Sequence, residues 1–521
     1  MNKKTVIKRI ILVAIALYST WCFSQEFQNL TKLEKTVISA TGTVVKVFRE
    51  KHDQIWPGYD LSKQPFMVYI PGKWALLVNS KNPVEGFVEY PEDWPDIHTD
   101  AMLHKGDLKG LSGQLAFNFK IDTITTLAIG LHENFYNLNT TEGLLEIFAF
   151  ITHESFHQFQ RQSFGEIPWA RAEKYPILDA ENTAMAYLEM KLLIDALKAK
   201  DAGDKEKCRE IVKDFALVRQ NRWKTADEFV RRYEQGQELN EGTAKYVEVK
   251  SVFCLMEMIE NDEHLDFEDS LLSSKMKNYI YDSFQSKMLG QTISPDDMIR
   301  NRIYPVGAAE GIMMDYIGID WKNDATEAGT GFAFADLVCK SLCIDGKTDT
   351  GSLAAVKQDY DYDDVLAATK QEIENYIDLY QAEQESFENQ EGSRIEVNLT
   401  YHSLSRAGNS RSKKWIMGNG AESLCMNYKL LKIVTDHHSF LLEDLAVYQQ
   451  YDWDQKKIKI VFFTPRELQF IVDGEAHFIH SLKDQQFSEL AILGEGIEVK
   501  VQSKGKMAAT GAGITVTEED E

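Results

Sequence analysis

The spacing of apolar residues changes twice along the chain, and these changes constrain the fold more than any other feature. Residues 37 to 135 are expected to form mixed structure with several short strands. From about residue 141 to 390 the apolar positions follow a helical repeat, and from residue 395 onward they alternate as in strands. The sequence therefore predicts an α+β chain, with an N-terminal mixed sheet and a helical region followed by an all-β C-terminal domain.

Individual segments support this division. Strands are expected at 66–70, 75–78, 114–119 and 121–131, where prolines and glycines separate short apolar runs. Residues 178–200 have the pattern of a long amphipathic helix. Near the C-terminus, strands are expected around 395–401, 458–463 and 497–501, with a hairpin at Asp473-Gly474. About seven short strands predict a small β-sandwich-like domain or a barrel over 395–521, after an acidic stretch at 381–393.

Composition limits the classes of partner. The chain has 521 residues and a net charge of −24, so two or three domains are expected. A nucleic-acid-binding protein normally presents a basic patch, and no basic run of that kind occurs here. The negative net charge also argues against anionic membrane surfaces as binding partners. Neither a GxSxG nucleophile elbow nor a phosphate-binding loop is present, so serine hydrolase and nucleotide chemistry lack support.

The N-terminus has the pattern of a signal peptide. Basic residues in MNKKTVIKR precede the short apolar run IILVAIALY, and the small residues Cys22 and Ser24 fit a cleavage site. The apolar run is shorter than the ~20 residues that a membrane span needs, which argues against an uncleaved anchor. Trp21 is too bulky to precede a lipidated Cys22. We expect residues 1–24 to be removed before Gln25 and the chain to be exported, periplasmic or secreted, without stable membrane insertion.

The stretch AFITHESFHQFQ carries the strongest chemical signal. His153 and His157 are four residues apart, which on an α-helix means about 40° around the axis and ~6 Å along it. Both imidazoles can therefore hold one Zn²⁺ ion, and Glu154 can take a proton from zinc-bound water. The alternative is a pair of solvated histidines on a polar helix face. The apolar surroundings of the stretch favour the zinc site.

A catalytic zinc ion needs a third protein ligand and an open fourth position. Two acids are candidates, Glu241 in LNEGTAKYVE and Glu181 in LDAENTAMAY. Glu241 is favoured because Gly242 and Ala244 allow its helix to pack closely against another, although it could also be an exposed acid at a helix start. The HExxHxxGxxH pattern of metzincins is excluded, because no third histidine follows His157 at that spacing.

HESFHQFQ followed by NEGTAKYVE resembles the gluzincins, zinc peptidases of the clan MA type that read HExxHxxQ and later EGxAxY. IWPGYD and YPVGAAEGIMMDYIGIDWK are similar to segments of uncharacterised exported bacterial members of that group. The resemblance covers roughly residues 50 to 325 and implies a zincin-like metallopeptidase domain over residues 25–390. It implies His153, His157 and Glu241 as zinc ligands and Glu154 as the general base.

The chain departs from the gluzincin pattern at one position. Many gluzincins have an aspartate four residues after the ligand glutamate, where this chain has Lys245. Glu181 or Glu248 could replace that aspartate as the partner of a zinc histidine. The long gap before Glu241 also implies an inserted helical hairpin at about 172–235. Tyr304 is the candidate for stabilising the oxyanion, as a tyrosine or histidine does in similar enzymes, with a core aromatic residue as the alternative.

These features favour an exported zinc-dependent peptidase that acts on a peptide or protein substrate. One alternative is a catalytically degenerate scaffold that binds a glycan or protein through the C-terminal domain, because that region is rich in aromatic residues (Tyr401, Trp415, Tyr428, Tyr448, Tyr451 and Trp453). Glu154 argues against the scaffold, which would have no use for a general base. A zinc enzyme with a non-peptide substrate is the third possibility.

Overall fold

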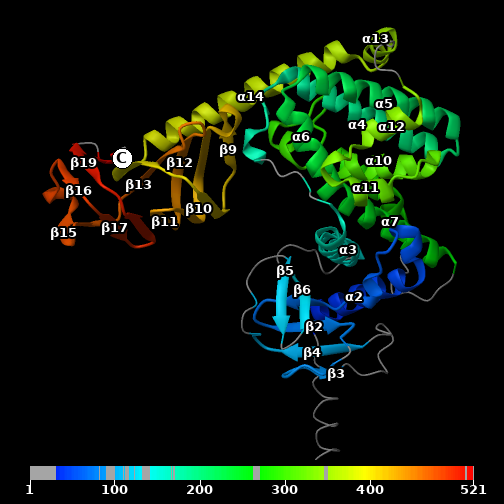
Figure 1. The fold of residues 1–521 in the computed structure, drawn as a ribbon, viewed down its shortest axis with the longest axis horizontal. Helices are drawn as coiled ribbons and strands as arrows, with labels where there is room; N and C mark the ends of the chain where they lie inside the picture. Colours follow the sequence, from blue (N-terminus) through cyan, green and yellow to red (C-terminus); the bar gives the residue numbers. More distant parts are fainter. Residues whose placement is uncertain are drawn as a thin grey trace, which may run out of the picture.

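A computed structural model (Figure 1) describes residues 31–80, 82–89, 100–108, 111, 116–121, 124–131, 141–165, 167, 171–261, 270–344, 350–510 and 513–519. The predicted signal peptide, residues 1–24, lies outside these ranges. The chain has an N-terminal mixed sheet, a helical body and a C-terminal β-domain. The predicted α+β class is therefore confirmed, together with the order of the three parts.

The N-terminal sheet has six strands in the order β3-β4-β2-β1-β6-β5. Their bounds are β1 Phe66–Ile70, β2 Trp74–Val78, β3 Val88–Glu89, β4 Ala101–Lys105, β5 Ala116–Ile121 and β6 Ile124–Gly130. β1 and β6 are parallel, and all other neighbours are antiparallel. The four strands expected from the sequence correspond to β1, β2, β5 and β6.

Alternate residues of the sheet belong to two hydrophobic clusters, one on each face. In β1, Val68 belongs to the main hydrophobic core, whereas Met67 and Tyr69 belong to a smaller cluster on the opposite face. The main-core face lies against α2 (Lys32–Ile55) and α3 (Thr141–Ser163), which pack on each other. α2 occupies the start of the segment expected to be rich in strands, and the capping box of Thr31 and Glu34 begins it.

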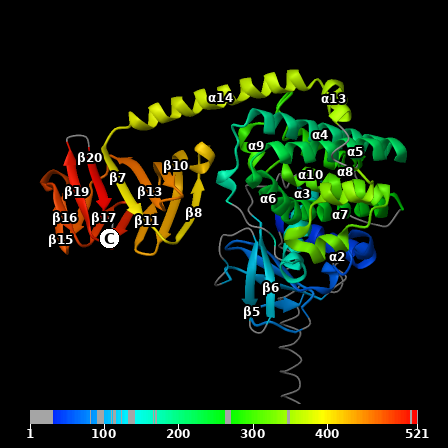
Figure 2. The ribbon, with the colours of Figure 1, turned by 45° about the horizontal axis from the view of Figure 1, so that its top comes forward.

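The helical body follows α3. Its helices are α4 Ala180–Asp201, α5 Lys205–Thr225, α6 Glu228–Gln237, α7 Thr243–Glu260, α8 Ser270–Gln285, α9 Pro295–Ile299, α10 Ile303–Ile317, α11 Lys322–Ala328, α12 Phe334–Ser341, α13 Thr350–Asp359 and α14 Tyr362–Glu388. α4 and α5 pack closely and form a helical hairpin inside the expected range 172–235. A π-helical turn, η3 (Glu238–Gly242), joins α6 to α7. Figure 2 shows α14 running from this body to the β-domain.

The C-terminal strands form one continuous 14-stranded sheet. They are β7 Ser393–Thr400, β8 Leu404–Ser410, β9 Lys414–Met417, β10 Glu422–Thr435, β11 His438–Leu442, β12 Leu445–Asp452, β13 Lys457–Thr464, β14 Gln469–Val472, β15 Glu475–Phe478, β16 Gln485–Phe487, β17 Leu490–Gly494, β18 Ile497–Val501, β19 Gly505–Thr510 and β20 Gly513–Glu518. The hairpin expected at Asp473-Gly474 joins β14 to β15, and both turn residues have positive φ.

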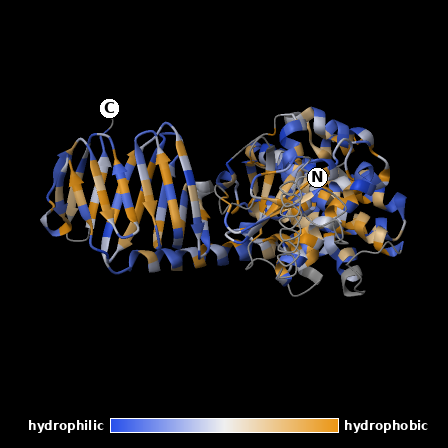
Figure 3. Cartoon of the chain, turned by 90° about the horizontal axis from the view of Figure 1, so that it is seen from below, coloured by the Kyte–Doolittle hydropathy of each residue, from blue (hydrophilic) through white to orange (hydrophobic). Residues whose placement is uncertain are grey.

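This sheet differs in form from the expected small sandwich or barrel of about seven strands. The long strand β10 pairs with β12 along its first half and with β11 along its second half, so it belongs to both arms of the sheet. The two arms enclose one hydrophobic core, to which β7, β13 and β20 contribute from one arm and β17 and β18 from the other. The domain is therefore a single curled sheet, and its strands alternate polar and apolar residues (Figure 3).

Candidate metal centre

The two histidines and Glu154 lie on α3, as the spacing of HESFH predicts. α3 packs against α2 and α7 through apolar residues such as Phe148 and Ile151. His153 is buried and His157 half-buried, and both face a cleft of about 920 Å³. Glu154 also lines this cleft. A rigid helix therefore presents both imidazoles and the carboxylate to the same space.

Glu241 completes a compact group of three possible ligands. Its Oε2 lies 3.4 Å from Nε2 of His153 and 3.4 Å from Nε2 of His157, and the two Nε2 atoms are 3.2 Å apart. Zinc bonds of ~2.0–2.1 Å at tetrahedral angles place neighbouring ligand atoms about 3.3 Å apart. The three atoms thus form a triangle of the size that one face of a zinc tetrahedron requires. This buried cluster could hold a metal ion.

The outer nitrogen of each histidine has a partner that accepts a hydrogen bond. Nδ1 of His153 lies 3.1 Å from Oε2 of Glu248, and Nδ1 of His157 lies 2.6 Å from Oε1 of Gln160. Both partner atoms are acceptors, so each Nδ1 carries a hydrogen, and each Nε2 would offer its lone pair to a bound metal ion. These contacts orient the rings and direct both lone pairs into the ligand triangle.

Gln160 also ties α3 to the turn that carries Glu241. Its Nε2 donates to the carbonyl oxygens of Leu239 (3.2 Å) and Asn240 (2.7 Å) and to Oγ1 of Thr243 (2.7 Å). These contacts fix the amide so that its oxygen faces His157. Gln160 is the final glutamine of the stretch that resembles HExxHxxQ, but its spacing alone did not reveal this supporting role.

The π-helical turn η3 brings Glu241 to the histidines through a close helix crossing. A Cβ atom on Gly242 would lie 2.9 Å from Cα of Gly307 in α10, and one on Gly307 would lie 2.6 Å from Cα of Gly242. Glycine at both positions therefore allows η3 and α10 to touch along their backbones. The close packing expected of Gly242 is present, and its partner is Gly307.

α10 and the residues before it bring Arg300 and Tyr304 to the same place. Nη2 of Arg300 donates to Oε1 of Glu241, which leaves Oε2 facing the histidines. The Tyr304 ring stacks on His153, with centroids 5.7 Å apart and planes 19° apart. Burial and the charge of Glu241 raise the pKa of Tyr304 well above its usual value, so its hydroxyl keeps its proton.

The charges of the centre are strongly coupled. Burial opposes charge on His153, but its hydrogen bonds to Glu241 and Glu248 outweigh burial and raise its pKa to about 9. Burial also acts against charge on Glu248, yet the charge of Lys245 and the hydrogen bond to His153 lower its pKa to about 2. The same histidines hold the pKa of Glu241 well below its usual range. The carboxylates are thus ionised, and a divalent cation would replace the proton on His153.

The structure separates the two candidates for the third ligand. Glu181 is exposed in the first turn of α4, and it belongs neither to the ligand cluster nor to the wall of the cleft. The position four residues after Glu241, where the sequence comparison led us to look for an aspartate, holds Lys245, which pairs with Glu248. Of the two acids considered as the partner of a zinc histidine, Glu248 is the one that contacts His153.

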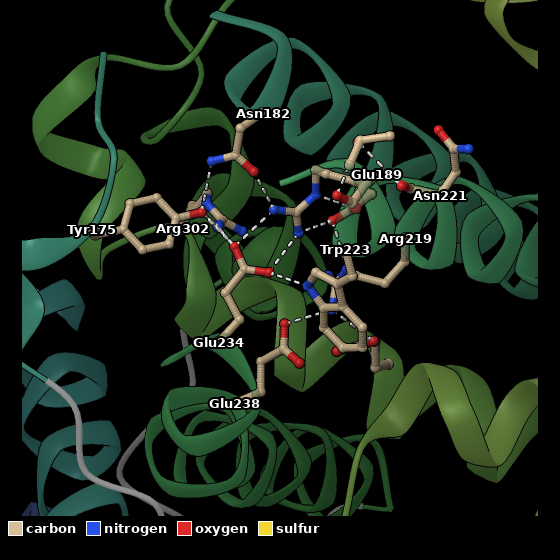
Figure 4. A network of polar contacts seen from close by, with 12 residues as sticks. Tyr175, Asn182, Glu189, Arg219, Asn221, Trp223, Glu234, Glu238 and Arg302 are labelled. Atoms are coloured by element: carbon tan, nitrogen blue, oxygen red, sulfur yellow. Dashed lines mark hydrogen bonds and ion pairs between the residues drawn. The ribbon is translucent and has the colours of Figure 1, made fainter. Parts of the chain in front are cut away.

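A buried ionic network lies next to η3, the turn that carries Glu241 (Figure 4). Arg222 donates to Glu189, Glu234 and Asn182, Arg302 donates to Glu234 and Tyr175, and Arg219 donates to Glu189 and Glu238. Glu238 is the first residue of η3, and Arg302 lies just before α10. The network therefore anchors both segments that meet at Gly242 and Gly307.

The network contains one more acid than it has bases. Glu189, Glu234, Glu238 and Glu310 face three arginines, and every one of these side chains is at most 2% exposed. Burial and the neighbouring charge of Glu238 raise the pKa of Glu310 well above its usual value. Glu310 therefore keeps a proton, which brings the charge of the cluster close to neutral.

The aromatic residues that suggested a binding surface on the β-domain are mostly internal. Tyr401, Trp415, Tyr428 and Tyr451 are buried. Trp453 stacks on Tyr451 at 4.6 Å, and the guanidinium of Arg171 lies 4.3 Å from its ring centroid. The four buried side chains fill the core of the domain and its contact with the helical body, whereas Trp453 lines a cleft at that contact.

The wall of the metal cleft comes from residues between Glu146 and Pro305, with no contribution from the described strands of the β-domain. No helix in the described ranges is long and apolar enough to span a membrane.

Comparison with known proteins adds no assignment, because no protein-family model, no curated protein and no solved structure matches this chain.

Proposed function

We propose that the chain is an exported zinc-dependent metallohydrolase and that it acts as a peptidase. The observation that carries this proposal is the ligand triangle of His153, His157 and Glu241, with edges of 3.2 to 3.4 Å, on the wall of an open cleft. Three protein ligands leave a fourth position for water or substrate, which is the ligand count of a catalytic zinc site. A structural zinc site would fill all four positions.

The side chains around the triangle fit hydrolysis. Bound zinc would lower the pKa of its water to about 7 and polarise a substrate carbonyl. Glu154 lines the cleft next to His153 and can accept the proton of the attacking water and pass it to the leaving amine. Tyr304 keeps its hydroxyl proton beside Glu241 and can donate to the oxyanion. Glu248 and Gln160 hold the histidine rings in place.

The proposal is tested by separating metal binding from chemistry. Glu154→Gln should keep a wild-type zinc content and reduce peptide hydrolysis by ~10²–10⁴, because Glu154 is the base and not a ligand. His157→Ala should lose both zinc and hydrolysis. Zinc content by mass spectrometry and hydrolysis of a mixed peptide library are measured for the zinc-loaded wild type and both variants. Unchanged hydrolysis by Glu154→Gln, or an inert zinc-loaded wild type, contradicts the proposal.

A further inference from the structure

The cleft at the metal centre differs in charge from the rest of the chain. Its wall has four acidic side chains, two of them Glu241 and Glu248, and four basic ones (Arg161, Lys245, Lys287 and Arg300), whereas the whole chain has a net charge of −24. A divalent cation at the ligand triangle would give this balanced wall a positive excess. The metal-loaded cleft therefore favours an anionic group on its substrate.

Arg300 is a cation fixed in position at the edge of the ligand triangle. Its Nη2 donates to Glu241, and its guanidinium lies 5.7 Å from the ring centroid of Tyr304. Its side chain is still 51% exposed, and its Nε and Nη1 make no hydrogen bond with a residue that the structure describes. Two contacts thus orient the guanidinium while donors remain for a ligand, and an oriented guanidinium suits a carboxylate.

Arg161 adds a second cation to the same wall. It follows Glu154 by seven residues on α3, which places the two side chains on one face of the helix about 10 Å apart along its axis. Arg161 forms no ion pair with any described residue. Arg161 is exposed on the cleft wall, so its guanidinium is available to an anion that enters the cleft.

We propose that the cleft binds its peptide substrate through a carboxylate close to the scissile bond, with Arg300 as the main contact and Arg161 as the second. This inference rests on the proposed peptidase function and names its substrate class. The carboxylate can belong to an acidic side chain or to the C-terminus of the peptide, since both present the same group to a guanidinium. Arg300 lies close to the reacting bond because its partner Glu241 is a ligand of the proposed zinc ion.

The test uses matched peptides and the full-length, zinc-loaded protein. One pair of fluorogenic peptides differs only by Glu against Gln next to the cleavage site, and a second pair differs only by a free or amidated C-terminus. The wild type should cleave one acidic member with at least ~10-fold higher kcat/KM than its neutral partner, as one charge-assisted contact allows. The pair that shows the preference identifies the source of the carboxylate.

Variants assign the preference to the two arginines. Arg300→Gln and Arg161→Gln should each reduce the preference mainly through KM, and Arg161→Gln should do so with a wild-type zinc content. Arg411→Gln is the matched control, because Arg411 is also 51% exposed and pairs with a carboxylate, Asp444, in the β-domain. It should keep the full preference.

The outcomes separate this inference from the proposed function. A wild type that cleaves acidic and neutral peptides equally, or a preference that survives in both arginine variants, overturns the substrate class and leaves the peptidase function standing. A zinc-loaded wild type that cleaves none of the four peptides nor the mixed library contradicts the peptidase function itself.

Discussion

At the scale of single residues, Gln160 shows how one side chain can hold two parts of a site together. It accepts from His157 and donates to the turn that carries Glu241, so its loss should loosen two of the three proposed ligands. We predict that Gln160→Ala lowers zinc affinity by about 10–100-fold, the usual cost of removing such a supporting partner. Zinc affinity is measured by competition with a chromogenic chelator.

The matched control for this variant is Gln220→Ala. Gln220 also donates a side-chain hydrogen bond, to Asp336, but it lies outside the metal cleft. Its replacement should leave zinc affinity unchanged. Equal zinc affinity of Gln160→Ala and the wild type would show that Gln160 does not position the ligands.

Residue by residue, the sequence predicts the proposed ligands and the proposed base better than the residues that support them. His153, Glu154 and His157 follow from spacing along one helix, because neighbours on a helix face depend only on its repeat. Glu241 was preferred to Glu181 because Gly242 and Ala244 allow close helix packing, and the resemblance of NEGTAKYVE to a family pattern supported this choice. The choice of Glu248 over Glu181 as the partner of His153 depends on how α7 crosses α3, which spacing along the chain does not specify.

At the scale of elements, the site depends on the crossing of η3 and α10. A Cβ on Gly307 would lie 2.6 Å from Cα of Gly242, a backbone atom that no side-chain rotation can move away. We predict that Gly307→Ala forces the two elements apart, lowers the free energy of unfolding by roughly 1–3 kcal/mol and weakens zinc binding. Urea denaturation and the chelator competition assay measure the two effects.

Gly331→Ala is the control for this substitution. A Cβ on Gly331 would meet no atom within 4 Å, and its backbone is not in the left-handed region. This variant should match the wild type in stability and zinc affinity. If Gly307→Ala behaves in the same way, the close crossing of η3 and α10 is not required.

Individual helices and strands with a strong apolar repeat were predicted well, but the way in which the C-terminal strands pair was not. The helix expected at 178–200 is α4, and the hairpin expected at Asp473-Gly474 joins β14 to β15. The sequence indicated about half of the 14 strands, because short strands such as β16 carry too few alternating positions to stand out. The continuity of the curled sheet depends on the pairing of β10 with strands on both arms, which is a long-range property.

At the scale of the whole molecule, the boundary between the helical body and the β-domain is packed like a core. The main hydrophobic core extends from the N-terminal sheet through the helices to Trp415, Leu424 and Phe463 of the β-domain. Trp415 packs on Tyr376 of α14 with ring centroids 4.9 Å apart, and Lys413 pairs with Asp296 across the boundary. A shared core of this kind couples the unfolding of the parts that it joins.

We therefore predict one main unfolding transition for the wild type and two for Trp415→Ala. Removing the buried indole should cost about 3–5 kcal/mol at the boundary and uncouple the β-domain from the helical body. Differential scanning calorimetry resolves the transitions, and zinc content should stay at the wild-type level because every proposed ligand lies on the other side of the boundary. Phe478→Ala, at a residue that is 50% exposed on β15, should keep one transition. Two separate transitions in the wild type would show that the shared core does not couple the domains.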